Sequence, residues 1–214
     1  MTQEEIYKLH QKYSEGENQE LLLNLVWGHS LIVRDIALEL ADNLIKKGIK
    51  IDKELVEIGA LVHDIGCYKC YEFYGRTDGP YIQHGVKGYE ILKNEGFSEE
   101  IARMAMIHLG VGLVEENVIA TKLPLEPKDY IPITLEEELV AYADNFHSKS
   151  GPKFDTFEKS REKLANLWPE SVIIFDRFRK KFGEPDLGKM EEKYGEWQEE
   201  MREKIENKTH PTLP

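Results

Sequence analysis

The segment ALVHDIGCYK, residues 60–69, places a histidine and an aspartate side by side at the end of an apolar helical stretch. Asp52 is a suitable N-cap for this stretch, and Gly66 is expected to end it. The apolar residues turn one face of the helix toward the interior, and His63 and Asp64 continue that pattern. Because a buried carboxylate without a partner is very costly, we expect a buried group that compensates Asp64.

Apolar residues recur at helical spacing through most of the chain, and alternating strand-like runs are scarce, which predicts an all-α protein. Ser98 is an expected N-cap. Two pairs of residues have the spacing of a capping box, namely Thr134 with Glu137 and Asp155 with Glu158. A loop is expected at residues 71–80. Predicted helices cover residues 2–14, 18 or 29 to 47, 52–66, 81–94, 98–109, a short segment near 115–123, 134–146, 155–168, 169–181 and 186–206.

The composition is that of one globular domain covering residues 1–214, with 41% hydrophobic and 32% charged residues. The start of the chain is polar and acidic, and no apolar run approaches the roughly 20 residues of a transmembrane helix, so we expect a cytoplasmic protein without a membrane partner. The net charge is −12, and no dense Lys/Arg stripe offsets it. This disfavours a nucleic acid polymer as partner but leaves open a small anionic substrate held by a few local cations.

The only cysteines, Cys67 and Cys70, form one CYKC motif, which is typical of a redox pair or of half a zinc site. The sequence has no second cysteine pair to complete a structural zinc site, and no βαβ pattern surrounds the motif. We therefore favour two reduced thiols.

Four of the seven histidines lie on the apolar stripes of their predicted helices, and two aspartates also point inward. A lone inward histidine is more often a core residue hydrogen-bonded to the backbone. Six such groups would each need a separate buried partner, whereas one shared metal site satisfies them together. Imidazole and carboxylate ligands suit iron, manganese, zinc and similar divalent ions. The six candidate metal ligands are His29, His63, Asp64, His84, His108 and Asp144.

The order of these residues resembles that of a known family. His29, then His63-Asp64, then Asp144 follow the order of the HD-domain superfamily of metal-dependent phosphohydrolases, in which HDIG is a frequent variant of the motif. Two further histidines between the HD pair and the last aspartate resemble the branch that holds two metals. That branch includes diadenosine tetraphosphate hydrolases, cyclic-dinucleotide phosphodiesterases and mixed-valent di-iron oxygenases. Residues 107–146 also resemble small archaeal-type HD proteins.

The resemblance covers about residues 24–148, the expected metal-binding core, and implies an HD-domain-like helical bundle. Residues 150–214 carry no recognised motif and are expected to add C-terminal helices. The resemblance also implies two divalent ions, with iron or manganese as the expected metals and zinc, nickel, cobalt and magnesium as alternatives. The first ion would be held by His29, His63, Asp64 and Asp144, and the second by His84 and His108, with Asp64 bridging the two.

Basic residues near these motifs are candidate ligands of a phosphate group, and the alternative for each is a solvated surface charge. They are Lys69, Arg76, Lys87, Lys149 and Lys153. Lys69 and Lys149 lead because they lie closest in sequence to the candidate metal ligands. Many family members have a lysine directly after HDIG, where this chain has Cys67, and Lys69 is the candidate for that catalytic position.

His147 lies one helical turn after Asp144 and is a candidate general acid for the leaving oxygen. The alternative, which its position favours, is a residue that caps the helix end. We expect His10 and His210, near the termini, to be exposed. The aromatic loop YEFYGRTDGPY, residues 71–81, is either a lid or base-stacking wall over the site or an ordinary surface loop.

The last predicted helix spaces apolar residues at intervals of four, three, four and four. This seam more often packs on its own domain than on a partner, and it leaves a homodimer open. The seam residues are Met190, Tyr194, Trp197, Met201 and Ile205.

The leading hypothesis is a hydrolase of a phosphoester or phosphoanhydride bond in a small nucleotide-like molecule, with two ions and a hydroxide nucleophile and with Asp64 central to catalysis. A di-iron oxygenase on the same ligands is the closest alternative, because six ligands leave open positions that dioxygen can occupy. A metal-dependent nucleotide sensor without turnover is the third.

Overall fold

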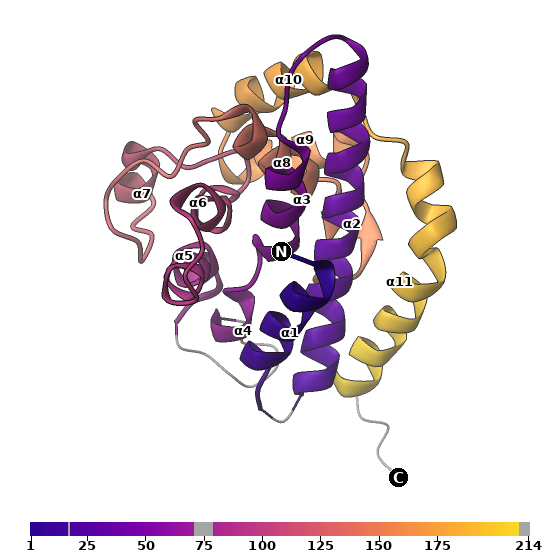
Figure 1. Ribbon diagram of the computed structural model, residues 1–214. Helices are drawn as coiled ribbons and strands as arrows, with labels where there is room; N and C mark the ends of the chain where they lie inside the picture. The colour runs from indigo at the N-terminus through magenta and orange to yellow at the C-terminus, as the bar shows by residue number, and fades with distance from the viewer. Residues whose placement is uncertain (17, 71–78, 210–214) are drawn as a thin grey trace.

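The computed structural model describes residues 1–16, 18–70 and 79–209 and is built almost entirely from helices (Figure 1). Two-residue strands, β1 (His147–Ser148) and β2 (Lys153–Phe154), form a small antiparallel hairpin. The predicted all-α class is confirmed. The helices are α1 (Gln3–Tyr13), α2 (Gln19–Lys46), α3 (Lys53–Val62), α4 (Cys67–Cys70), the 3₁₀ turn η2 (Tyr81–Gln83), α5 (His84–Asn94), α6 (Glu99–Ile107), α7 (Glu115–Ala120), α8 (Leu135–Asp144), α9 (Phe157–Leu167), α10 (Ser171–Phe182) and α11 (Leu187–Thr209).

Helix α2 is the central element of a single helical bundle. Helices α3 and α8 pack against α2, and α11 lies along the outer side of α2 (Figure 1). Helix α5 packs against α6. By length and hydropathy α2 is able to cross a bilayer, but 61% of its most apolar stretch is buried inside the protein. This burial is what the core helix of a bundle requires.

The C-terminal helices share a core with the rest of the chain. Leu164 of α9, Phe175 of α10 and Met190 of α11 belong to the same buried cluster as Ile36 and Leu40 of α2. The C-terminal helices are therefore held to α2 by apolar packing.

The apolar seam of α11 packs on its own chain, as its spacing predicted. Met190 and Met201 are buried, and Tyr194 packs against the cluster that contains Ile36 and Leu40. Trp197 contacts this cluster and a second one around Leu25, which Ile205 also contacts. The indole of Trp197 fills the space beside Gly28, where a Cβ atom would lie 2.1 Å from the ring. A glycine in the middle of α2 thus permits the close approach of α11.

Two predicted helix starts require correction. Thr156, and not Asp155, caps α9, because its side chain accepts a hydrogen bond from the Lys159 N–H. Asp155 is buried and pairs with Lys159 and Lys163 instead. Either residue can act as a cap, so burial of Asp155 decided the outcome.

The start of α8 is capped by Thr134 as expected, but the reciprocal half of the capping box is replaced. The Glu137 carboxylate accepts from the Ile133 N–H and forms an ion pair with Arg103, with the Nε donor 2.7 Å from Oε1. This pairing ties α8 to α6.

His10 is fully buried, contrary to the expectation of exposure near a terminus. Its Nε2 donates to the Leu61 carbonyl at 2.9 Å, so its Nδ1 accepts from the Tyr68 hydroxyl at 2.8 Å. Burial lowers the pKa of His10 to about 4, against the opposing effect of the Leu61 hydrogen bond. The signal was present in the sequence, because His10 follows Ile6 by one helical turn on the inward face of α1. His210 lies outside the described residues.

Gly66, the last residue of HDIG, sets the distance between two parts of the site. A Cβ atom at this position would lie 1.9 Å from the His84 carbonyl oxygen and 2.4 Å from the Gly88 nitrogen. Only glycine therefore allows the turn that carries Asp64 to contact the start of α5 through backbone atoms.

We predict that Gly66→Ala separates the turn after α3 from α5. The free energy of unfolding should fall by about 2–3 kcal/mol, because backbone atoms must move to admit the methyl group. The affinity for a divalent ion should fall as well, because His84 moves with α5. Gly151→Ala is the control, since a Cβ atom there meets nothing within 4 Å. Urea unfolding and metal titration of both variants measure these effects, and equal stability of the two would contradict this role of Gly66.

Candidate metal centre

The six candidate ligands come from five separate places in the bundle and converge at its centre. One lies in the middle of α2, two lie in the turn directly after α3, and the others lie at the start of α5, just after α6 and at the end of α8. The sequence predicted a helix as far as residue 66, but α3 ends at Val62. The HD pair therefore lies in a turn. All six are buried or nearly so: they are His29, His63, Asp64, His84, His108 and Asp144.

Four of these side chains form the first group. The Nε2 atom of His29 lies 2.9 Å from Asp144 Oδ1, and it is 3.2 Å from both His63 Nε2 and Asp64 Oδ2. The donor atoms of all four lie within 4.8 Å of one another. The arrangement therefore offers two imidazoles and two carboxylates to one point in space.

The remaining two histidines face the other side of Asp64. His84 Nε2 and His108 Nε2 are 2.9 Å apart, and each lies 3.4 Å from Asp64 Oδ1. Asp64 thus directs Oδ2 toward the first group and Oδ1 toward the second. This is the geometry needed for one carboxylate to bridge two cations.

Backbone carbonyls fix the orientation of three of the imidazoles. The Nδ1 atoms of His63, His84 and His108 lie 2.6–2.7 Å from the carbonyl oxygens of Ala60, Tyr81 and Ala105. A carbonyl only accepts, so each Nδ1 carries the hydrogen and each Nε2 directs a lone pair into the cluster when the ring is neutral. Histidines that bind metals are held in this way.

The residues present fit a divalent cation. Two ligands bonded at about 2.0–2.1 Å to one ion are separated by about 2.9 Å in octahedral and about 3.4 Å in tetrahedral geometry. The separations among the cluster atoms, 2.9–3.4 Å, fall in this range. Neutral His84 and His108 direct two lone pairs at each other over 2.9 Å, which is repulsive unless a cation lies between them. The buried His/Asp cluster is therefore consistent with the binding of divalent metal.

Among the predicted cations in the described part of the chain, Lys149 is the one that reaches the cluster. Its ammonium group contacts Asp64 Oδ2 and lies 3.3 Å from His29 Nε2. Burial acts to lower the pKa of Lys149, but Asp64 overrides it and raises that pKa well above the usual range. Burial likewise acts to raise the pKa of Asp64, and Lys149 with the surrounding histidines holds it well below the usual range.

His147 lies in strand β1 and does not cap α8, whose C-cap is Asn145. The helix-cap interpretation is therefore wrong. Instead, the Nδ1 atom of His147 lies 2.8 Å from the Nδ1 atom of His29. For Nε2 of His29 to face the cluster with a lone pair, its Nδ1 must carry the hydrogen and donate it to His147. His147 thus does for His29 what backbone carbonyls do for the other three histidines.

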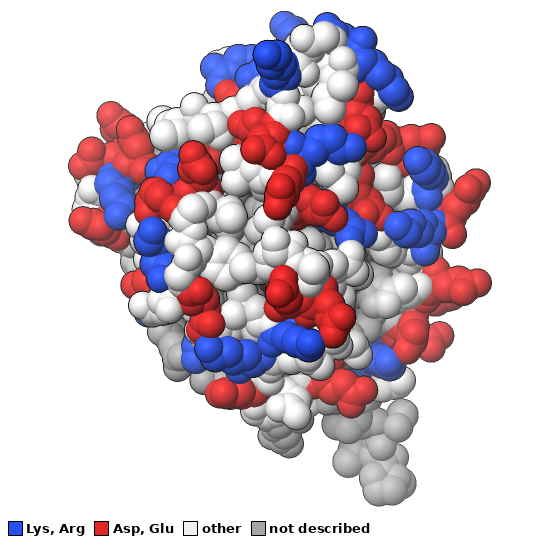
Figure 2. All heavy atoms as spheres, in the orientation of Figure 1, with Lys and Arg blue, Asp and Glu red and all other residues white. Residues whose placement is uncertain are grey.

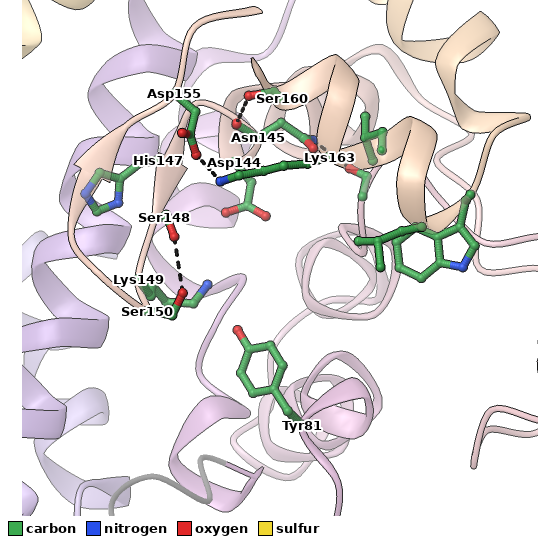
Figure 3. A pocket seen from close by; sticks show the side chains of 14 residues that line it. Tyr81, Asp144, Asn145, His147, Ser148, Lys149, Ser150, Asp155, Ser160 and Lys163 are labelled. Atoms are coloured by element: carbon green, nitrogen blue, oxygen red, sulfur yellow. Dashed lines mark hydrogen bonds and ion pairs between the residues drawn. The ribbon is translucent and has the colours of Figure 1, made fainter. Parts of the chain in front are cut away.

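A pocket of about 880 Å³ opens beside the first group of ligands. In Figure 3, Tyr81 points toward the loop of the β1–β2 hairpin, and Lys163 reaches toward Asp155 above the Asp144 carboxylate. Helix α9 and the residue after it provide a further wall, which is mostly apolar. The residues that line the pocket are Tyr81, Gly110, Asp144, Asn145, His147, Ser148, Lys149, Ser150, Asp155, Ser160, Lys163, Leu164, Leu167 and Trp168.

Three other basic residues singled out in the sequence are described by the structure, and they do not line this pocket. Lys69 Nζ lies over the ring of Tyr13 at 5.9 Å, Lys87 pairs with Glu90 at 3.7 Å, and Lys153 is exposed on β2. Arg76, with most of the aromatic loop, lies outside the described residues.

Sequence reasoning missed the pocket residues contributed by the C-terminal helices. Ser160, Lys163, Leu164 and Leu167 lie at spacings of three, one and three, so they share one face of α9. That face was recognisable as amphipathic, but nothing in the local sequence indicated that it would face the metal ligands.

Comparison with known proteins identifies the class to which this fold and cluster belong. Residues 26–149, more than half of the chain, match the HD domain family, and the chain belongs to that family. An uncharacterized protein of Methanocaldococcus jannaschii is 44% identical over 143 residues, which cover 66% of this chain and 78% of that protein.

Other relatives are larger proteins. The tRNA (cytidine(56)-2'-O)-methyltransferase of Picrophilus torridus is 38% identical over 144 residues, which cover 64% of this chain but only 38% of the methyltransferase. Among solved structures, the HD domain of the L. monocytogenes phosphodiesterase PgpH has a TM-score of 0.46 and 20% sequence identity, with coverage of 72% of this chain and 84% of that one.

We predict that His147→Ala weakens metal binding without unfolding the protein. Loss of a partner that orients a metal-binding histidine typically lowers affinity about 10–100-fold. Titration of the metal-stripped protein with Mn²⁺ in calorimetry measures the change, and circular dichroism checks the fold. Unchanged Mn²⁺ affinity would show that the hydrogen bond to His147 is not required to orient His29.

The stabilisation that a bound metal gives to the fold should increase as the pH rises. Burial acts to lower the pKa of His63, but attraction to Asp64 and hydrogen bonds to Asp144 and Asp64 raise it to about 9. In metal-free protein the charged ring therefore stabilises the fold below about pH 6.5, and this contribution is lost as the pH rises through about 9. A bound ion replaces that proton, so metal binding should strengthen over the same range.

Thermal unfolding between pH 6.5 and 9 under argon, with EDTA or with excess Mn²⁺, tests this expectation. The difference in Tm between the two forms should widen with rising pH. A difference that narrows would mean that no ligand gives up a proton to the metal.

Proposed function

We propose that the protein is a metal-dependent phosphohydrolase that cleaves a phosphoester or phosphoanhydride bond of a small nucleotide-like molecule. The observation that carries this proposal is the position of Asp64, whose two oxygens face two separate groups of nitrogen and oxygen donors next to an open pocket. Membership of the HD domain family agrees with a phosphohydrolase.

The proposed metal content is two divalent ions, with iron or manganese favoured by the nitrogen and oxygen donors. Two ions bound there supply hydroxide at neutral pH and positive charge for the oxygens of a phosphoryl group. His29, His63 and Asp144 hold one ion, His84 and His108 hold the other, and Asp64 holds both.

The remaining polar residues of the pocket suit a phosphate group. The Lys149 ammonium next to Asp64 would neutralise a phosphate oxygen and fix its position beside the ligands. The hydroxyl groups of Ser148 and Ser150, 3.4 Å apart at the tip of the hairpin, are further donors. Lys163, held by buried Asp155, adds a second cation on the opposite wall.

The apolar wall suits the organic part of such a substrate. Leu167 is 62% exposed although it lines the pocket, and Leu164 and Trp168 continue the same surface. Ligand pockets are typically lined by apolar and aromatic side chains together with a few polar groups that orient the ligand. A base or similar planar group would cover this surface while its phosphate reaches Lys149.

A long polyanion fits less well. On the face shown in Figure 2, acidic and basic side chains of the described residues alternate, and the basic ones form no continuous stripe. We therefore propose a small molecule, and not a nucleic acid polymer, as the substrate.

Turnover by the metal-loaded protein tests the proposal. Dinucleoside polyphosphates, cyclic dinucleotides and nucleoside monophosphates should be screened with Fe²⁺ or Mn²⁺, with and without oxygen. We expect hydrolysis without oxygen and about two bound metal equivalents. Loss of all activity in Asp64→Ala, and of one equivalent in His84→Ala, would follow from the bridging geometry.

Lys149 provides the sharper test of substrate position. Lys149→Met should lower kcat/KM about 10–100-fold, because a cation at the developing charge is lost. Lys153→Met, four residues away and exposed, is the matched control and should leave kcat/KM unchanged. Turnover that requires oxygen would instead favour the di-iron oxygenase, and binding without turnover would favour the sensor.

A further inference from the structure

Cys67 occupies the position directly after HDIG and lies beside the second group of ligands. Its sulfur atom is 3.3 Å from Asp64 Oδ1, the oxygen that faces His84 and His108. We infer that Cys67 is a ligand of the second ion, which completes a donor set of two imidazoles, one carboxylate oxygen and one thiolate. The inference rests on the two-ion site of the proposed function but not on its chemistry.

The local backbone places the thiol at this point. The Cys67 N–H donates to the Asp64 carbonyl at 2.9 Å, which closes a turn and brings the two side chains to one side of it. The donor atoms of Asp64, Cys67 and His84 all lie within 4.8 Å of one another, and all three residues are buried. Bonds of about 2.3 Å to sulfur and about 2.0–2.2 Å to oxygen separate two adjacent ligands of one ion by about 3.0–3.7 Å, and the 3.3 Å between the sulfur and Asp64 Oδ1 falls in this range.

The arrangement of His84 and His108 indicates a cation independently of Cys67. Each has its Nδ1 bound to a carbonyl oxygen, and their Nε2 atoms face each other over 2.9 Å. With Asp64 Oδ1 these atoms provide three donors, and the sulfur of Cys67 lies within 4.8 Å of the donor atoms of Asp64 and His84. Four donors of nitrogen, oxygen and sulfur are the usual set for a tetrahedral ion.

Binding of the ion changes the role of the thiol. In the metal-free protein the S–H group donates to Asp64 Oδ1. Cys67 would hold a bound ion as a thiolate, with its proton released to solvent and the hydrogen bond to Asp64 given up. A thiolate ligand favours softer ions, so the second site should prefer iron, cobalt or zinc to magnesium or manganese.

Cobalt spectroscopy tests the assignment without any substrate. Metal-stripped protein loaded with two equivalents of Co²⁺ should show a thiolate-to-cobalt charge-transfer band in the near ultraviolet. Cys67→Ser should lose this band and bind the second equivalent about 10–100-fold more weakly. Cys70→Ser is the matched control, because Cys70 is also a buried cysteine of the same short helix, and it should keep both the band and the affinity.

Serine separates ligation from simple positioning. A hydroxyl at residue 67 can still donate to Asp64, so unchanged metal affinity in Cys67→Ser would overturn the inference. Absence of the band from wild-type protein that holds two cobalt ions would overturn it as well, even if Cys67→Ser fails to fold. If wild-type protein lacks the band but hydrolyses a substrate, the proposed function still holds without this inference. If wild-type protein binds no second ion, both the inference and the two-ion site of the proposed function are wrong.

Discussion

A buried carboxylate among four imidazoles is the constraint on which the rest of the structure depends. Asp64 is fully buried and has imidazole nitrogens at 3.2–3.4 Å from both of its oxygens. Such a group is stable only with compensating positive charge. In the structure Lys149 and charged His63 supply part of it, and a divalent ion is the partner that the geometry fits. The cluster is consistent with the divalent metal binding that is typical of the HD domain family.

The bundle holds this cluster together through a few close approaches. Gly66 allows the HD turn to meet α5, and backbone carbonyls orient three histidines. His147 does the same for His29 from a hairpin outside the helices. The same hairpin carries Lys149 to Asp64, so the segment between α8 and α9 both completes the cluster and forms part of the pocket. Orientation of ligands and access to them are therefore coupled in this segment.

The helices and the converging faces could be predicted from the sequence because each apolar stripe is a local property. The convergence of His29, His84 and His108 followed from such stripes together with the family resemblance. The pocket wall of α9 could not be predicted, because contact between Leu167 and the site depends on how α9 packs against the core. His10 was misjudged because proximity to a terminus was weighed above its spacing from Ile6. Asp155 and Thr156 were equally suitable caps, and only tertiary pairing with Lys163 separated them.

Anomalous diffraction from crystals of metal-loaded protein is the most direct measurement of the central claim. Data collected at the iron and manganese absorption edges should show two peaks on opposite sides of the Asp64 carboxylate, each at about 2.0–2.3 Å from one of its oxygens. One peak should lie among His29, His63 and Asp144, and the other beside His84 and His108. Crystals of protein incubated with metal that show no peak within bonding distance of Asp64 would contradict the account.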